Sequence, residues 1–292
     1  IWKGLVGSEM CIRDSDWWAQ GYSEPGSGSD LASLKTKAVD HGDHYIVNGQ
    51  KTWTTLGQFA NKIFCLVKTD TNCKPQNGIS FLLIDIDSPG IEVRPIITLD
   101  GEHEVNEVWL KDVKVPKENL LGEENKGWTY AKYLLTHERT GIAGVPNSKS
   151  AINHLKVIAN KTYKNGKPLI QDPLFSSQIA ELEIDLKAME IFNLRAISSA
   201  ESGKAPVMES SLLKIKGSII RQKTSDLLRK AIGPQALPYI SEQFDEGWNQ
   251  ETIGPEYAGP LAKQYFIYRK ISIYGGSNEI QKNIVAKSEF RM

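Results

Sequence analysis

The pair of residues best suited to acid–base chemistry is a glutamate followed by an arginine, Glu138 and Arg139. The pair lies in a segment of helical character beside the apolar residues Leu134, Leu135 and Ile142. A glutamate buried among such side chains has its pKa raised, which is what a general base requires near neutral pH. The alternative is a structural ion pair with Arg139 or another arginine, and the residues alone favour that alternative.

Two further segments have the composition of a binding site. The loop Gly26 to Asp30 follows Glu24 and Pro25, and glycine–serine loops bring backbone N–H groups and hydroxyls close to phosphates. At the expected end of a strand, Trp53 to Thr55 offers an indole face and hydroxyls to a planar heterocycle. Taken alone, the loop is typical of a surface turn, and a core tryptophan explains the second segment equally well.

The remaining motifs mainly exclude functions. Nucleotide-binding GxGxxG and P-loop patterns, the HExxH and GxSxG patterns and paired-cysteine zinc patterns are absent from the sequence, and we expect no metal site. Cys11, Cys65 and Cys73 form no CxxC pair, which favours a reducing compartment, a bacterial cytoplasm or an organelle matrix. Tyr274 to Glu279 predicts a turn between two helices, with Ser277 as the N-cap.

The composition is that of an ordinary soluble protein of two domains. The chain has 292 residues, with 35 basic and 35 acidic side chains, so no charge excess indicates nucleic acid or lipid as a partner. No apolar stretch approaches the roughly 18 residues of a membrane span. Residues 1–15 begin without methionine and show no period, and we expect a non-native or disordered segment there.

Residues 32 to 113 predict an antiparallel β-barrel or sandwich. Short apolar runs alternate with turn residues, and Asn48 and Gly49 predict a two-residue hairpin turn after the strand residues 45 to 47. The other expected strands cover residues 62 to 67, 79 to 86, 90 to 97 and 106 to 115. The β domain is expected to occupy residues 16–124.

Residues 125–292 predict a C-terminal bundle of about four long helices. A first helical segment runs from about Asn125 to Tyr163, and Pro146 is expected to kink or interrupt it. Asp172 and Pro173 predict the start of a long helix. Its buried stripe is Phe175, Ile179, Leu182, Leu186 and Met189. The next helix, from Val207 to about Ala231, is expected to bury Leu212, Ile215 and Ile219, and two more helices follow Pro255 and start near Ser277.

Four segments, in this order, resemble motifs of the acyl-CoA dehydrogenase family. Ser23 to Asp30 resembles its TEPGxGSD loop and Asn48 to Thr55 its NGxKxWIT strand. Asp112 to Gly122 resembles DVxVPxxNxLG, and Tyr274 to Gln281 the closing YEGTxxIQ element. The likeness extends from about residue 18 to the C-terminus, and it implies a fragment that lacks the family's N-terminal helical domain.

The resemblance implies a set of contacts to FAD and acyl-CoA. Implied FAD contacts are Gln20, Tyr22, Ser23, Ser29, Trp53, Thr55, Ser277 and Glu279, and implied substrate contacts are Ser29, Arg139 and Gly275. By analogy Thr55 bonds near flavin N5, where a hydride arrives, and Trp53 lies on the side where an electron-transfer flavoprotein docks.

The implied reaction is α,β-dehydrogenation of an acyl-CoA thioester to the trans-2-enoyl-CoA, in which a carboxylate takes the α-proton and a hydride passes to flavin N5. Many members place the base second in YEGT, where this chain has Gly275. Others use a glutamate that precedes an arginine on the first long helix, so the resemblance assigns the base to Glu138. The N–H of Gly275 is the implied donor to the thioester oxygen.

The resemblance also implies a homotetramer or a two-plus-two heterotetramer, with electron-transfer flavoprotein as electron acceptor. Two positions depart from the family pattern. An RxxFG-like string is absent from Asn160 to Gly166, and the GGNG loop reads Gly233 to Ala236 as GPQA. Alternatives to a catalytic dehydrogenase are a non-catalytic partner subunit of a hetero-oligomer and an acyl-CoA oxidase.

Overall fold

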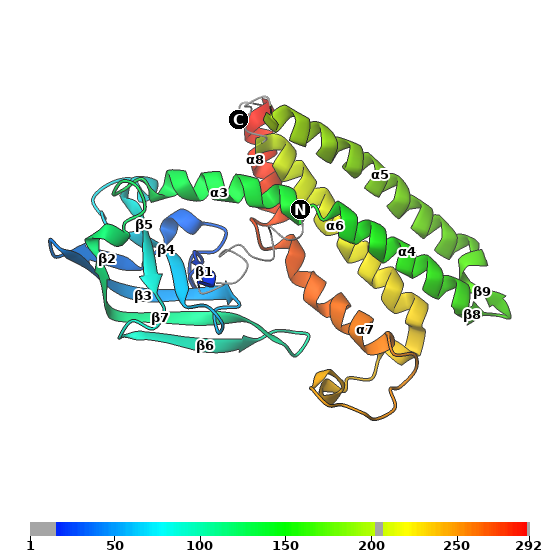
Figure 1. Ribbon diagram of the computed structural model, residues 1–292. Helices are drawn as coiled ribbons and strands as arrows, with labels where there is room; N and C mark the ends of the chain where they lie inside the picture. Colours follow the sequence, from blue (N-terminus) through cyan, green and yellow to red (C-terminus); the bar gives the residue numbers. More distant parts are fainter. Residues whose placement is uncertain (1–15, 202–206, 291–292) are drawn as a thin grey trace, which may run out of the picture. The chain divides into compact units, whose positions relative to one another are not determined.

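A computed structural model gives the structure of the protein and describes residues 16–201 and 207–290 (Figure 1). The expected non-native segment 1–15 therefore lies outside the described residues. Contacts divide the chain into two units, one ending at Tyr133 and one beginning at Leu134. Helix α3 (Gly127–Ile142) runs across this division.

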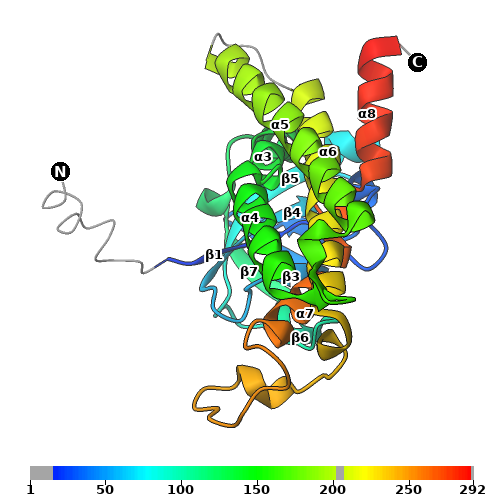
Figure 2. The same ribbon diagram turned by 90° about the vertical axis from the view of Figure 1, so that its right-hand side faces the viewer.

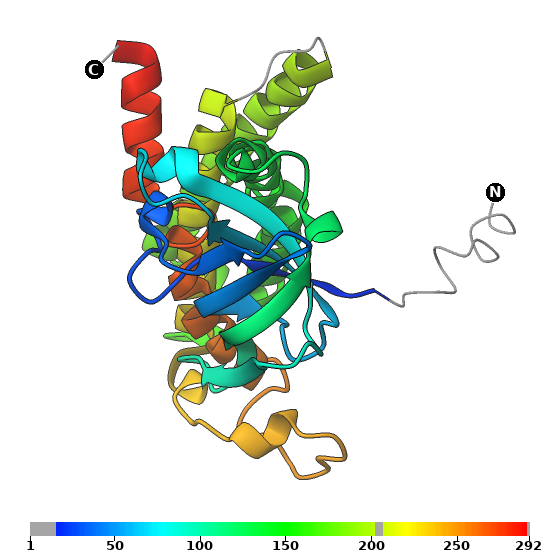
Figure 3. The same cartoon turned by 90° about the vertical axis from the view of Figure 1, so that its left-hand side faces the viewer.

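The first unit is built on a curled sheet, which faces the viewer in Figure 3. Its strands are β1 (Trp18–Gly21), β2 (Lys37–Asp40), β3 (His44–Thr55), β4 (Lys62–Lys68), β5 (Ile79–Asp85), β6 (Ile91–Ile97) and β7 (His103–Pro116). The strand order is β1-β4-β2-β3-β7-β6, with β5 paired to β4. The predicted fold class of this half of the chain, a mainly antiparallel β-barrel or sandwich, is confirmed. Most pairs are antiparallel, and the additional finding is that β1 and β2 each pair with β4 in parallel.

Along the strands of this sheet, buried apolar side chains alternate with more exposed ones, and the buried ones form the core. Tyr45 and Val47 on β3 and Val113 and Val115 on β7 are all buried, and their intervening neighbours are more exposed. Strand β4 is apolar over nearly its whole length and has partner strands on both edges. Cys65, Leu66 and Val67, which point alternately to the two faces of the sheet, are all fully buried.

The hairpin predicted at Asn48 and Gly49 is wrong, because β3 continues through both residues. Glycine is needed at position 49 for space, since a Cβ there would lie 2.3 Å from the Thr36 hydroxyl oxygen. Asn48 bridges to β7, donating to Asp112 Oδ1 at 3.0 Å and accepting from the Asp112 N–H at 2.9 Å. The turn lies earlier, between β2 and β3, where Gly42 has a φ of 94°.

The second unit is helical, as predicted. It contains α4 (Val145–Lys161), α5 (Pro173–Glu201), α6 (Val207–Ile232), α7 (Ala258–Ile267) and α8 (Asn278–Phe290), together with a short hairpin of β8 (Tyr163–Lys164) and β9 (Lys167–Pro168). Helices α4, α5 and α6 pack side by side (Figure 2). Among the described residues, no helix combines the length and apolar character that would let it cross a membrane.

Local signals at the helix ends are confirmed. Pro146 lies in the first turn of α4 and separates it from α3, and Gly144 between them has a left-handed φ of 58°. At the start of α5 the Asp172 carboxylate accepts from the N–H groups of Leu174 at 3.0 Å and Phe175 at 3.1 Å. The predicted stripe on α5, which begins at Phe175 and ends at Met189, is buried throughout.

The buried face of α6 differs from the prediction by one residue. Leu212, Ile215 and Ile219 are only partly buried, whereas Leu213 and Ile220 are fully buried. The reason is a close approach at Gly217, where an added Cβ would lie 2.6 Å from the carbonyl oxygen of Ala143. This contact fixes the rotation of α6, and because apolar residues occur on both of its faces, periodicity alone leaves the rotation undetermined.

Candidate functional site

A buried ion pair joins the glycine–serine loop to β3. Lys51 Nζ lies 2.8 Å from Glu24 Oε1 and donates to the Tyr22 carbonyl at 3.2 Å. The Lys51 side chain is fully buried and that of Glu24 is 6% exposed. A backbone bond from Thr52 N to Ser23 O, at 2.9 Å, lies beside the pair. The first two sequence motifs are therefore one structural assembly.

The environment of Glu24 keeps it ionised. Burial raises its pKa, but the charge and hydrogen bond of Lys51 outweigh burial, and the net pKa lies below the ordinary value of 4.5. Backbone N–H groups add to this, since Glu24 accepts from Lys35 N at 2.6 Å and Thr36 N at 2.9 Å. The carboxylate thus fixes both ends of the loop that contains Ser29.

A β-bulge shapes the end of β3. Lys51 pairs with Val108 and Thr54 with Asn106, so three steps along β3 match two along β7. Within the bulge Trp53 has a φ of 60°, a left-handed conformation that costs a bulky residue on the order of 1–3 kcal/mol. The Trp53 side chain is 59% exposed, and Thr55, two residues on, is also exposed. The bulge presents both side chains to the outside of the sheet.

The other residues of the β unit that are expected at the cofactor lie on β1 and in the glycine–serine loop. Gln20 lies on β1 opposite Phe64 of β4 and is partly buried. Tyr22 is buried and packs edge-on against Phe64, with ring centroids 5.9 Å apart. Ser23 is partly buried and Ser29 is exposed. The loop thus has a buried, anchored start and an exposed end.

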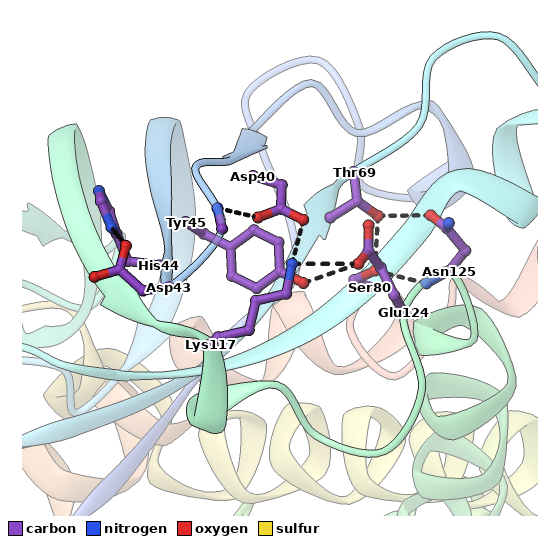
Figure 4. Close-up of polar contacts among 10 residues, drawn as sticks. Asp40, Asp43, His44, Tyr45, Thr69, Ser80, Lys117, Glu124 and Asn125 are labelled. Atoms are coloured by element: carbon purple, nitrogen blue, oxygen red, sulfur yellow. Dashed lines mark hydrogen bonds and ion pairs between the residues drawn. The ribbon is translucent and has the colours of Figure 1, made fainter.

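A charged cluster lies where β2 ends and β3 begins in the same sheet (Figure 4). Lys117 forms an ion pair with Asp40, lies 3.7 Å from a Glu124 oxygen, and stands 4.3 Å from the centre of the Tyr45 ring. The Tyr45 hydroxyl donates to Glu124 at 3.0 Å. The hydrogen bond between Lys117 and Asp40 lowers the pKa of the carboxyl and raises that of the lysine. The cluster ties β2, β3 and the segment before α3 together.

Three polar side chains anchor the chain just before α3 (Figure 4). Thr69 donates to Asn125 Oδ1 at 2.6 Å, and the Asn125 N–H donates to Ser80 Oγ at 2.7 Å. Ser80 and Thr69 hydroxyls are 2.7 Å apart, and because Thr69 has one proton, Ser80 is the donor. Asn125 has a left-handed φ of 65°, which asparagine tolerates. The start of α3 is therefore fixed to the sheet.

Glu138 lies on α3, but its side chain is exposed, so the expected apolar burial is wrong for the described chain. Leu134 beside it is 38% exposed, while Ala143 is buried against α6. The side chains of Arg139 and Ile142 lie outside the described residues. This face of α3 is thus open at the position of the expected base.

The closing loop before α8 has a defined backbone. Ser277 caps α8, since its hydroxyl accepts from Ile280 N at 3.3 Å, as predicted. Gly275 has a left-handed φ of 67°, and its carbonyl accepts from the amide of the buried Gln281 at 3.1 Å. Glu279 is exposed in the first turn of α8. The loop holds the Gly275 peptide in a fixed orientation within its unit.

Residue type alone does not single out Glu24 and Lys51, although both lie inside matched motifs. The usable signal is alternation along β3, where Tyr45, Val47 and Lys51 share the inward parity. A lysine at an inward position requires a buried acceptor, and Glu24 is that acceptor. Within residues 16–201 and 207–290 no cluster of three or more His, Cys, Asp or Glu side chains could hold a metal ion.

Comparison with known families identifies the chain. The family model described as acyl-CoA dehydrogenase, middle domain, matches residues 19–113, and that described as acyl-CoA dehydrogenase, C-terminal domain, matches residues 125–290. The chain belongs to the acyl-CoA dehydrogenase family. Its class is therefore that of oxidoreductases acting on acyl-CoA, and the resemblance found in the sequence is confirmed.

Relatives of the chain agree with this assignment. Acyl-CoA dehydrogenase IpdE1 of Mycobacterium tuberculosis is 32% identical over 282 residues, which cover 94% of this chain and 67% of IpdE1. The solved acyl-CoA dehydrogenase of Geobacillus kaustophilus is 29% identical with a TM-score of 0.80, covering 98% of this chain and 75% of that one. The ChsE4-ChsE5 complex of Mycobacterium tuberculosis is 28% identical with a TM-score of 0.80, covering 97% and 71%. The chain thus spans about two thirds of the length of IpdE1.

Proposed function

We propose that this acyl-CoA dehydrogenase family chain carries out FAD-dependent α,β-dehydrogenation of an acyl-CoA thioester to the trans-2-enoyl-CoA. The observation that carries the proposal is the bulged end of β3, which presents Trp53 and Thr55 outward while the buried pair of Lys51 and Glu24 fixes the adjacent loop. A strained, non-glycine backbone at such a place is typical of a functional site.

The residues of the β unit fit FAD. An exposed indole at Trp53 and a hydroxyl at Thr55 offer a stacking face and a hydrogen bond to a flat heterocycle. In the loop, Ser27 Oγ is buried and has no hydrogen-bond partner among the described residues. This hydroxyl is therefore left to donate a hydrogen bond to a polar group of a ligand. Gln20, Tyr22, Ser23 and Ser29 complete the proposed cofactor contacts of this unit, and Ser277 and Glu279 those of the helical unit.

In the proposed chemistry Glu138 acts as the base. Its carboxylate takes the α-proton of the acyl group, and the α,β double bond forms as the β-hydrogen leaves with its electron pair. FAD, when bound, supplies the acceptor for that hydride. The exposed position of Glu138 on α3 leaves the carboxylate accessible to a substrate.

Three residues are proposed to hold the substrate. The N–H of Gly275 is the donor to the thioester oxygen, and a donor there stabilises the charge that develops as the α-proton leaves. The bond from Gln281 to the Gly275 carbonyl keeps the neighbouring backbone in place. Ser29 and Arg139 are the proposed contacts to the rest of acyl-CoA.

Anaerobic flavin reduction tests this function in protein that contains this chain. We expect a yellow protein whose flavin bleaches on addition of a suitable acyl-CoA. Glu138→Gln is expected to slow that bleaching by about 10²–10⁴-fold while leaving FAD binding intact. Glu181→Gln, an exposed glutamate of α5, is the matched control and should leave the rate unchanged. Near-normal bleaching in Glu138→Gln would refute the assignment of the base, and a protein that takes up no FAD would indicate a non-catalytic partner subunit.

We further propose a tetramer, of one chain type or of two, with electron-transfer flavoprotein as electron acceptor. Helix α5 exposes Ile184, Ile191 and Leu194, at 69%, 47% and 58%, on a helix whose opposite stripe is buried in the unit. Apolar residues in this pattern favour contact with another chain. If the reduced flavin passes its electrons to oxygen instead, the protein is an acyl-CoA oxidase.

A further inference from the structure

A closed ring of hydrogen bonds joins Gln58, His103 and Asn106 in the β unit. Gln58 Nε2 donates to the His103 carbonyl at 3.0 Å, and His103 Nε2 lies 2.6 Å from Asn106 Oδ1. Asn106 Nδ2 donates to Gln58 Oε1 at 2.7 Å. The ring closes through the backbone of His103, whose carbonyl accepts from Gln58 and whose imidazole bonds to Asn106.

The side chain of Asn106 connects this ring to the bulge of β3. Asn106 Nδ2 also donates to the Thr54 carbonyl at 3.1 Å. Because both N–H groups of this amide point at oxygen atoms, its orientation is determined, and His103 must be the donor to Asn106 Oδ1. Asn106 is fully buried, so every polar atom of its side chain is satisfied by protein.

Thr54 is the residue between the two exposed side chains of the proposed flavin site, Trp53 and Thr55. Its carbonyl is bound at the position where the β3–β7 ladder resumes after the bulge. Gly57 packs against the same place, since a Cβ there would lie 3.2 Å from the Thr54 methyl carbon and 3.3 Å from Asn106 Nδ2. The segment has little room to shift while the ring is closed.

We propose that Asn106 is a positioning residue, which acts through the closed ring with Gln58 and His103 to hold the Thr54 peptide and thereby aim Trp53 and Thr55. The inference rests on the proposed function, because it assumes that these two side chains meet FAD. Asn106 acts on the site through the Thr54 peptide and does not itself contact cofactor or substrate. The ring replaces the regular ladder bonds that the bulge removes and keeps the left-handed Trp53 in one conformation.

A comparison of two asparagines tests the inference. Asn48→Ala is the matched control, because Asn48 also bridges β3 to β7 at a bulge, through Asp112, at the other end of β3. In FAD-free protein, hydrogen exchange of the peptide covering residues 53–57 is expected to speed up at least about tenfold in Asn106→Ala and to stay within about twofold in Asn48→Ala. The FAD dissociation constant is expected to rise about tenfold in Asn106→Ala alone.

The outcomes separate the roles. Equal exchange and equal FAD affinity in the two variants, with only a lower melting temperature for Asn106→Ala, would overturn the inference and leave the ring a structural feature. If Asn106→Ala does not fold, Gln58→Ala, a change at a partly buried member of the ring, opens the ring instead. An unchanged exchange rate and an unchanged FAD affinity in Gln58→Ala would also overturn the inference. Absence of FAD from the unsubstituted protein would overturn the proposed function and this inference together, and is recognised before any variant is made.

Discussion

Glu24→Gln is expected to destabilise the β unit by about 3–5 kcal/mol, the cost of breaking a buried ion pair by removing one partner. The substitution removes the counter-charge of the fully buried Lys51 ammonium, which keeps only neutral acceptors, the Tyr22 carbonyl and the new amide oxygen. The new amide nitrogen must also face one of the two backbone N–H groups, of Lys35 or Thr36, that the carboxylate accepted. Two donors in contact in a buried site leave both without a partner, so the cost lies in the upper half of that range.

Lys51→Met is expected to cost less than Glu24→Gln. Methionine fills the space of the lysine stem, and Glu24 keeps its bonds from Lys35 N and Thr36 N. The double variant, with both changes, is expected to be more stable than the sum of the single losses predicts, by a coupling free energy on the order of 1–3 kcal/mol.

Urea unfolding followed by tryptophan fluorescence measures these differences, because Trp17, Trp53 and Trp109 lie in the β unit. Asp85→Asn is the control, since it breaks the exposed ion pair of Asp85 with Lys62 and is expected to cost about 1 kcal/mol or less. Losses in Glu24→Gln no larger than in this control, or strictly additive losses in the double variant, would refute the reasoning.

Three further predictions follow from named contacts. The folded pKa of Glu24 is lowered from 4.5, so its stabilising contribution is present above about pH 4.5 and is lost as the pH falls through the folded value; urea unfolding in a pH series should therefore show the gap between unsubstituted protein and Glu24→Gln closing on acidification. Gly217→Ala places a Cβ 2.6 Å from the Ala143 carbonyl and is expected to cost about 1–3 kcal/mol in thermal unfolding of the helical unit followed by circular dichroism, with no loss contradicting the close approach. Ile184→Glu with Ile191→Glu is expected to yield smaller species in sedimentation at unchanged helix content, and an unchanged sedimentation coefficient would exclude this face of α5 from the assembly.

Features that depend on near neighbours along the chain were predictable from the sequence. The capping carboxylate of Asp172, the break at Pro146 and the cap at Ser277 each act over one turn of backbone, and all three are found where expected. The buried stripe on α5 follows from apolar residues spaced three and four apart, which lie on one face of a helix. The ordered motifs then identified the family, and the family models confirm it.

Tertiary structure decided the features that depend on residues far apart in sequence. Asn48 and Gly49 have the composition of a hairpin turn, yet packing against Thr36 and the bridge to Asp112 keep β3 extended. The rotation of α6 depends on Ala143, more than seventy positions from Gly217.

The geometry of the candidate site also required the tertiary structure. The partner of Lys51 lies 27 positions away at Glu24, and the ring that holds Thr54 reaches 52 positions along the chain to Asn106. The apolar residues beside Glu138 in sequence do not predict its solvent exposure, because that exposure depends on which other elements cover α3. Sequence determines which residues are present and the local conformations they favour, whereas the packing of distant segments determines which polar groups meet, because only contact between those segments removes them from water.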